Sequence, residues 1–314
     1  MQERREAIKK LGSKEAGSIG MAMGIRKRRA LIWAAALLLF FLLMLITPRI
    51  PQDESYHDFA DQRQFFGIPN ALDVISNFPF LVIGIIGLVL CLKKKYFSLR
   101  GEVWGWAFFF IGIAATAFGS SYYHLHPTDA RLVWDRLPMT VAFASIMAVF
   151  IIERFDEWTG TVSILPLLAA GVISVAYWRY ADDLRPYALV QFVPCIAIPA
   201  MAIVLPPKYT HSSFWLWAAG CYLLAKVMEA LDKQIFTWTG QVVSGHTLKH
   251  LSAAMVPVFT MIMVVRRSEA LERVSMLQRF KVHMKGATYE GPSDLVEPKQ
   301  RVHEVEEFES LLQT

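Results

Sequence analysis

Residues 103–123 read VWGWAFFFIGIAATAFGSSYY, a run of 21 residues without a charged side chain. A helix of this length rises about 30 Å, which is the thickness of the hydrocarbon core of a bilayer. Seven further apolar runs have a similar character, and they cover residues 30–47, 73–92, 137–153, 160–178, 187–205, 213–231 and 245–265. The runs predict an all-α, polytopic membrane protein that crosses the bilayer as a helical bundle.

The composition agrees with this prediction, because 54% of the 314 residues are hydrophobic and only 19% are charged. The charges gather at the ends of the chain: residues 1–29 hold 9 Lys/Arg and 3 Glu, and residues 266–314 hold 8 Lys/Arg and 9 Asp/Glu. This distribution excludes a soluble globular enzyme and a disordered chain. It is typical of the flanks of membrane helices, so we expect the bilayer as a partner and no nucleic acid.

The placement of lysine and arginine predicts that both termini are cytosolic, with an even number of crossings. The 29-residue leader and the absence of a small-residue cleavage site favour a retained anchor over a cleaved signal peptide. Four segments are therefore predicted: a basic cytosolic segment 1–29, an N-terminal transmembrane anchor 30–48, a seven-helix core 49–265 and a flexible cytosolic tail 266–314.

Polar clusters at the ends of the runs are functional candidates, because polar groups are costly at membrane depth. In the first cluster, Ser120 and His124 are four residues apart and share one helix face. The alternative is a membrane-interface end with tyrosines and a snorkelling histidine. The second cluster places Asp135 before Pro138 at the start of run 137–153, where its alternative role is an N-terminal helix cap.

Two further clusters open other runs. His246 and His250 are four residues apart, so both can reach one metal ion, although a pair of interfacial histidines is the alternative. Lys249 lies on a different helix face and is expected to snorkel. Asp73, Ser76 and Asn77 fall within one helical turn and form a polar stripe, for which hydrogen bonding between helices is the alternative.

The predicted topology places these clusters at one membrane level. Run 103–123 crosses outward and ends at His124, Asp135 follows eleven residues later, and the last run starts outside at His246. Three neutral imidazoles with one open position are the ligand set of a catalytic zinc site. We therefore expect His124, His246 and His250 to bind Zn²⁺ towards the non-cytosolic, lumenal side.

Ser120-x3-His124, Asp135 and His246-x3-His250 together resemble the alkaline ceramidases. This family belongs to a superfamily of seven-helix zinc membrane hydrolases that includes the adiponectin receptors and Per1-like proteins. Segments 119–139 and 244–254 carry most of the resemblance, and weaker similarity covers residues 60–265. The resemblance implies a ceramidase of sphingolipid metabolism, in the endoplasmic reticulum or Golgi, that hydrolyses ceramide or phytoceramide to a sphingoid base and a fatty acid.

The same resemblance implies a role for each matching residue. The three histidines would ligate zinc, and Asp135 would move protons between the attacking water and the leaving amine, or alternatively orient a ligand histidine. Ser120 would position the water or stabilise the oxyanion. Asp73, Ser76 and Asn77 would give polar support to the site.

The chain departs from the family in one region. Animal members carry an acidic Asp-Trp-Cys-Glu-x-Asn stretch before their first core helix that looks like a calcium site. Residues 59–70 here read FADQRQFFGIPN, which keeps Asp61 and adds the positive charge of Arg63. Calcium needs several oxygen ligands, so calcium regulation is not expected, and Asp61 and Asn70 are left as a remnant of such a site.

Two other functions on the same scaffold are open alternatives. One is a receptor-type member of the superfamily, whose zinc site would lie on the cytosolic side. The other is an ester-cleaving, Per1-like enzyme of lipid remodelling. A lack of charged residues in the middle of the runs argues against an ion-coupled transporter.

Overall fold

The computed structural model describes residues 37–284 together with residues 27, 30, 31, 34 and 35. The predicted basic segment 1–29, apart from Lys27, lies outside the described residues, and so does the predicted tail beyond Met284. The chain divides into two compact units, Met1–Ile50 and Pro51–Thr314. In the first unit, the predicted anchor is represented by the apolar helix Leu37–Ile46.

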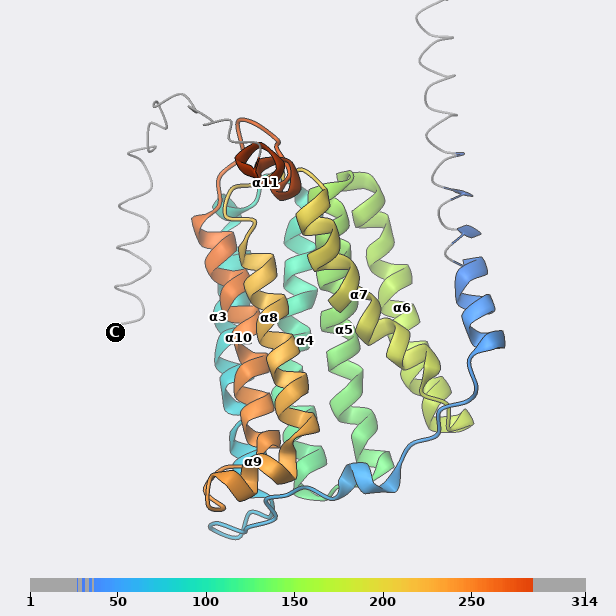
Figure 1. Cartoon of the computed structure of the whole chain (residues 1–314), viewed down its shortest axis with the longest axis vertical. Coiled ribbons are helices and arrows are strands. Elements are labelled where there is room, and N and C mark those ends of the chain that lie inside the picture. Colours follow the sequence, from blue (N-terminus) through green and yellow to red (C-terminus); the bar gives the residue numbers. More distant parts are fainter. Residues whose placement is uncertain (1–26, 28–29, 32–33, 36, 285–314) are drawn as a thin grey trace, which may run out of the picture. The chain divides into compact units, whose positions relative to one another are not determined.

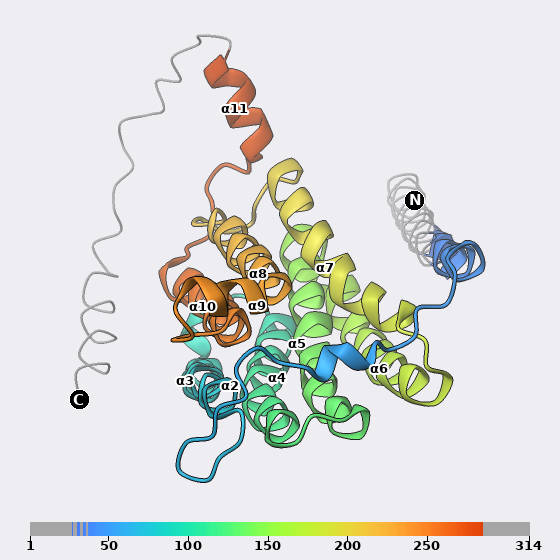
Figure 2. The ribbon, with the colours of Figure 1, turned by 60° about the horizontal axis from the view of Figure 1, so that its bottom comes forward.

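The second unit is a bundle of helices (Figure 1). Its elements in chain order are η1 (Glu54–His57), α2 (Ala71–Ile75), α3 (Phe78–Leu92), η2 (Lys94–Tyr96), α4 (Arg100–Leu125), α5 (Asp129–Arg154), α6 (Glu157–Ala181), α7 (Arg185–Val204), α8 (Phe214–Ala230), α9 (Asp232–Trp238), α10 (Gly245–Arg266) and α11 (Met276–Met284). Helix α4 packs between α3 and α5, while α10 packs against α8 (Figure 2). The described residues form no sheet, so the all-α prediction is confirmed.

Six helical segments are long and apolar enough to cross a membrane: Ala71–Leu92, α4, α5, α6, α7 and α10. Helices α8 and α9 pass the same test only as a pair, and they are bent by 80° relative to each other. The pair would make a seventh span. The polytopic bundle is thus confirmed. Helix α8 covers run 213–231, and α9 follows this run after the bend.

Helix α5 begins eight residues before the apolar run that predicted it. Thr128 is its N-cap, and the Thr128 side chain accepts a hydrogen bond from the backbone N–H of Arg131. Asp135 therefore lies in the second turn and does not cap the helix, and Pro138 lies inside it. Apolar composition marks the hydrocarbon-facing part of a helix, whereas the cap marks where the helix starts.

The predicted tail 266–314 begins with a segment that packs against the bundle. Helix α10 ends at Arg266, and α11 begins only at Met276. Between them, Glu269 forms an isolated backbone bridge with Tyr209 from the α7–α8 link. Arg267, which follows α10, is buried and pairs with Glu102 of α4 and Glu153 of α5. This ion cluster ties α4, α5 and the end of α10 together.

Close packing between α4 and α5 depends on glycine. A Cβ atom at Gly112 would lie 2.8 Å from the backbone N of Ala142, and one at Gly119 would lie 2.0 Å from the carbonyl O of Trp134. Small residues let two helix backbones approach in this way. The contact at Gly119 brings the end of α4 against the turn of α5 that carries Asp135.

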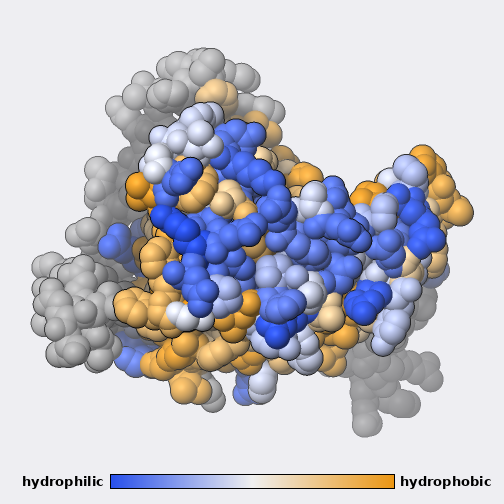
Figure 3. Space-filling view, turned by 90° about the horizontal axis from the view of Figure 1, so that it is seen from below, coloured by the Kyte–Doolittle hydropathy of each residue, from blue (hydrophilic) through white to orange (hydrophobic). Residues whose placement is uncertain are grey.

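The end of the bundle that holds the start of α10 is polar on its surface. Figure 3 shows hydrophilic residues gathered over this end and hydrophobic residues at its edge. Below that surface lies a buried aromatic and aliphatic cluster, which consists of Phe59, Tyr123, Leu132, Val175, Trp178 and Tyr187.

Candidate metal centre

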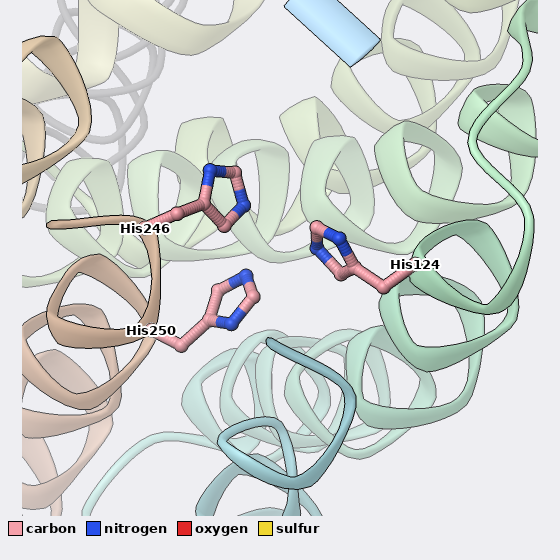
Figure 4. A group of neighbouring side chains, drawn as sticks. All are labelled: His124, His246 and His250. Carbon is pink, nitrogen blue, oxygen red and sulfur yellow. The ribbon is translucent and has the colours of Figure 1, made fainter. Parts of the chain in front are cut away.

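Three histidines from two helices meet inside this end of the bundle (Figure 4). His124 lies in the last turn of α4, and His246 and His250 lie in the first two turns of α10. Their possible ligand atoms all lie within 4.8 Å of one another, and the ring centroids are 4.8 to 5.0 Å apart. All three side chains are buried, with 1 to 4% exposure. This group could hold a metal ion.

The hydrogen bonding of His124 fits a metal ligand. Its Nδ1 and Nε2 atoms are both buried, and neither has a hydrogen-bond partner among the described residues. Leaving a buried polar group unpaired costs about 1–3 kcal/mol. Neutral imidazole is the commonest metal ligand in proteins, so a bound cation would satisfy a nitrogen that the chain leaves open.

Ser76 sets the tautomer of His250. The Ser76 hydroxyl donates to the carbonyl O of Asp73 (3.1 Å) and lies 2.7 Å from Nδ1 of His250. Since its only proton goes to Asp73, Ser76 accepts the bond from the Nδ1–H of His250. The lone pair of His250 is then on Nε2, where it is available to a metal.

Asp73 holds the start of α10 in place. Its Oδ1 accepts from the hydroxyls of Thr247 (2.7 Å) and Ser244 (3.3 Å), and Ser244 is the N-cap of α10. Asn77 donates from Nδ2 to the carbonyl O of Asp73 at 2.8 Å. The predicted polar stripe therefore packs against the turn that carries His246 and His250.

Asp61 and Asn70 have different hydrogen-bond partners in the structure. Both carboxylate oxygens of Asp61 accept from the Arg63 guanidinium, at 2.7 Å each. Burial raises the pKa of Asp61, but the bonds from Arg63 outweigh burial and hold that pKa below its ordinary value. Asn70 donates from Nδ2 to the carbonyl O of His124 at 2.8 Å. Asp61 thus stabilises the loop before α2, and Asn70 stabilises the end of α4.

Ser120 and Asp135 form a buried polar pair beside the histidines. Ser120 lies one turn before His124 on α4, and its hydroxyl interacts with the carboxylate of Asp135 on α5. The two side chains are 2% and 7% exposed. A carboxylate in this position can accept and return a proton next to a metal-bound substrate.

Lys249 is part of the site, although its sequence position predicts a snorkelling residue on another face. Its Nζ lies 2.7 Å from Nε2 of His246 and 3.3 Å from Oε1 of Glu229. Glu229 also accepts from Lys226 at 2.7 Å. The Lys249 ammonium donates to Nε2, so this nitrogen holds the lone pair of a neutral His246, and a metal bound at Nε2 would take the place of Lys249. The sequence signal for this part of the site was the presence of two charged residues, Lys226 and Glu229, inside the apolar run 213–231.

Asp232 is a second residue that sequence reasoning missed. Its Oδ1 accepts from the backbone N–H of His246 (2.7 Å), and its Oδ2 accepts from that of Ala60 (2.9 Å). The neighbouring Phe59 ring packs on the rings of His124 and His246, with centroids 4.7 and 4.5 Å away. Asp232 follows the bend between α8 and α9, a feature that no local pattern predicts.

Comparison with known proteins does not assign the chain to a family. No protein-family model matches the chain, and no curated protein is significantly similar to it. The resemblance to the alkaline ceramidases therefore rests on the residues quoted above.

Proposed function

We propose that the protein is a zinc-dependent membrane amidase that hydrolyses ceramide-type lipids to a sphingoid base and a fatty acid. One observation carries the proposal: three buried imidazoles lie within reach of a single ion, and both nitrogens of His124 lack a partner in the described chain. Ser120 lies one turn before His124 on the same face of α4, and Asp135 on the adjacent α5 adds a proton carrier.

The donor set fits zinc. Three histidines and one open position are the arrangement of catalytic zinc sites, and no cysteine lies among these ligands. Bound there, Zn²⁺ would lower the pKa of a coordinated water to about 7 and polarise the amide carbonyl. Ser76 and Asp73 would keep the ligand histidines of α10 in position.

Asp135 moves the proton that amide hydrolysis requires. Its carboxylate takes a proton from the attacking water as the new C–O bond forms, and returns it to the amide nitrogen as the C–N bond breaks. Ser120 holds the carboxylate by its hydroxyl interaction. The products are a fatty acid and an amine, which accounts for every atom of the lipid and the water.

The surroundings agree with a lipid substrate. The helices that carry the site are apolar and long enough to span a membrane, so a bilayer lipid need not enter water to reach it. The Lys/Arg distribution favours the non-cytosolic side of the membrane for the site, and the resemblance to the alkaline ceramidases favours the endoplasmic reticulum or Golgi.

Purified protein in detergent tests the proposal with ceramide and with an acyl-ester lipid of the same chain length. We expect the wild type to release sphingoid base, and His246→Ala to lose about 10³-fold or more of that activity. The matched control is His211→Ala, an exposed histidine in the α7–α8 link. Negligible amide cleavage by the zinc-loaded wild type would refute the amidase, and cleavage of the ester alone would indicate a lipid-remodelling esterase.

A further inference from the structure

Arg136 directly follows Asp135 on α5, and its side chain is only 5% exposed. Arginine is almost never buried to this degree unless a negative charge pairs with it. The other deeply buried arginine, Arg267, follows this rule, because it contacts both Glu102 and Glu153. Arg136 does not.

The hydrogen-bond partners of Arg136 leave one of its donors open. Its Nη2 donates to the neutral side chain of Gln52 at 2.7 Å, while its Nη1 is buried without a hydrogen-bond partner. In the part of the chain that the structure describes, no carboxylate forms an ion pair with it. A buried cation with an open donor is costly, so a negative group from outside the chain is expected.

Three aromatic rings surround the guanidinium. Its Cζ lies 4.1 Å from the ring centroid of Trp178, 4.8 Å from that of Tyr187 and 5.5 Å from that of Tyr56. Cation–π attraction offsets part of the cost of burial. It satisfies no N–H group, however, and the open Nη1 donor remains.

The nearby carboxylates do not fill this donor. Asp135 attracts Arg136 electrostatically, but the two residues form no hydrogen bond or ion pair. Glu229 accepts bonds from Lys226 and Lys249, and also from the Tyr56 hydroxyl at 3.4 Å. In the described chain, neither carboxylate therefore accepts from the open Nη1 of Arg136.

We propose that Arg136, with Gln52 and the three aromatic rings, forms an anion site that takes the phosphate of an acidic N-acyl lipid. The planar fork of a guanidinium suits a phosphate, which can accept two parallel N–H bonds. Arg136 is the chain neighbour of Asp135 on α5. The lipid substrate rests on the proposed function, whereas the anion site does not.

Binding to the purified full chain tests the site without any turnover. The probes are dodecyl phosphate, dodecanol and inorganic phosphate, and the readout is the shift of the thermal unfolding midpoint with probe concentration. We expect dodecyl phosphate to stabilise the wild type at concentrations more than tenfold below those needed for the other two probes. Equal stabilisation by dodecanol would overturn the anion site, and equal stabilisation by inorganic phosphate would overturn its assignment to a lipid.

Variants test whether the binding of dodecyl phosphate depends on Arg136. Arg136→Gln is expected to weaken dodecyl phosphate binding more than about tenfold, because the buried charge is lost. The matched control is Arg131→Gln on the same helix, whose side chain donates to the carbonyl O of Tyr122 and should bind as the wild type does. If Arg136→Gln does not fold, Arg136→Lys decides, since a lysine keeps the charge without the fork; unchanged binding in it would overturn the proposal.

The two proposals fail differently. A chain that binds dodecyl phosphate through Arg136 but cleaves no amide keeps the anion site and loses the amidase. A chain that cleaves ceramide but binds dodecyl phosphate no better than dodecanol keeps the amidase and loses the anion site.

Discussion

The Ser76 hydroxyl decides which nitrogen of His250 is free, because it accepts from Nδ1–H while donating to the carbonyl O of Asp73. Partners of this kind typically contribute 10- to 100-fold to metal affinity. Ser76→Ala is therefore expected to weaken zinc binding by about that factor, measured by competition with a chelator. Ser121→Ala is the control, since its hydroxyl donates to the Val74 carbonyl and touches no histidine. Equal affinities in both variants would contradict the role of Ser76.

Among the described residues, Glu229 is the carboxylate that forms ion pairs with Lys226 and Lys249, between α8 and α10. These three side chains are partly buried, with 15 to 31% exposure. Breaking a fully buried ion pair costs about 3–5 kcal/mol, and partial exposure reduces this cost. Glu229→Gln should thus lower the stability of the protein by about 1–3 kcal/mol, measured by denaturant or thermal unfolding in detergent. Glu269→Gln removes an exposed carboxylate 3.8 Å from Lys208 and should change stability by less than about 1 kcal/mol. Similar losses in both would contradict the stabilising role of Glu229.

At the scale of the helices, the approach of α4 to α5 at Gly119 places Ser120 next to Asp135. A Cβ at Gly119 would lie 2.0 Å from the Trp134 carbonyl O, so the backbones would have to separate. Gly119→Ala is expected to cost about 1–3 kcal/mol of stability and to lower amide hydrolysis. The control is Gly220→Ala on α8, where a Cβ meets no atom within 4 Å. If the two variants unfold at the same temperature, the close approach is not needed.

The way in which the helices pack and bend also explains why parts of the site could not be predicted from the sequence. Helical spacing alone predicts that Ser120 faces the same way as His124, and His246 the same way as His250. Lys249 was misjudged because its direction depends on Glu229 of another helix, and Asp232 because it follows the 80° bend between α8 and α9. Arg136 reads as the charged boundary of a span, because apolar composition does not reveal that α5 starts at Asp129.

At the scale of the whole molecule, hydropathy was sufficient for the fold class, since continuous apolar runs leave the backbone few choices in lipid. It did not predict α9, because the apolar run ends where the chain bends, and α9 beyond the bend contains charged and polar residues. The meeting of α4 and α10 depended on a further assumption, namely that the crossings alternate, which puts the end of one helix beside the start of the other. The structure has the three histidines together in this way.

Orientation in the membrane is a prediction from the Lys/Arg distribution, and α10 gives a way to test it. Val242 precedes the helix and Leu271 follows it, and their side chains are 66% and 97% exposed. A single cysteine at either position, in a chain whose native cysteines are alanine, reports its side of the membrane to an impermeant thiol reagent. We expect Val242→Cys to react from the non-cytosolic side and Leu271→Cys from the cytosolic side. The reverse pattern would favour the receptor-type orientation.

The metal content of the purified protein tests the central claim most directly. If His124, His246 and His250 hold one ion, the wild type binds about one zinc per chain, and His124→Ala binds almost none while remaining folded. A folded wild type that binds no zinc, or a His124→Ala variant that binds as much zinc as the wild type, would contradict the metal centre.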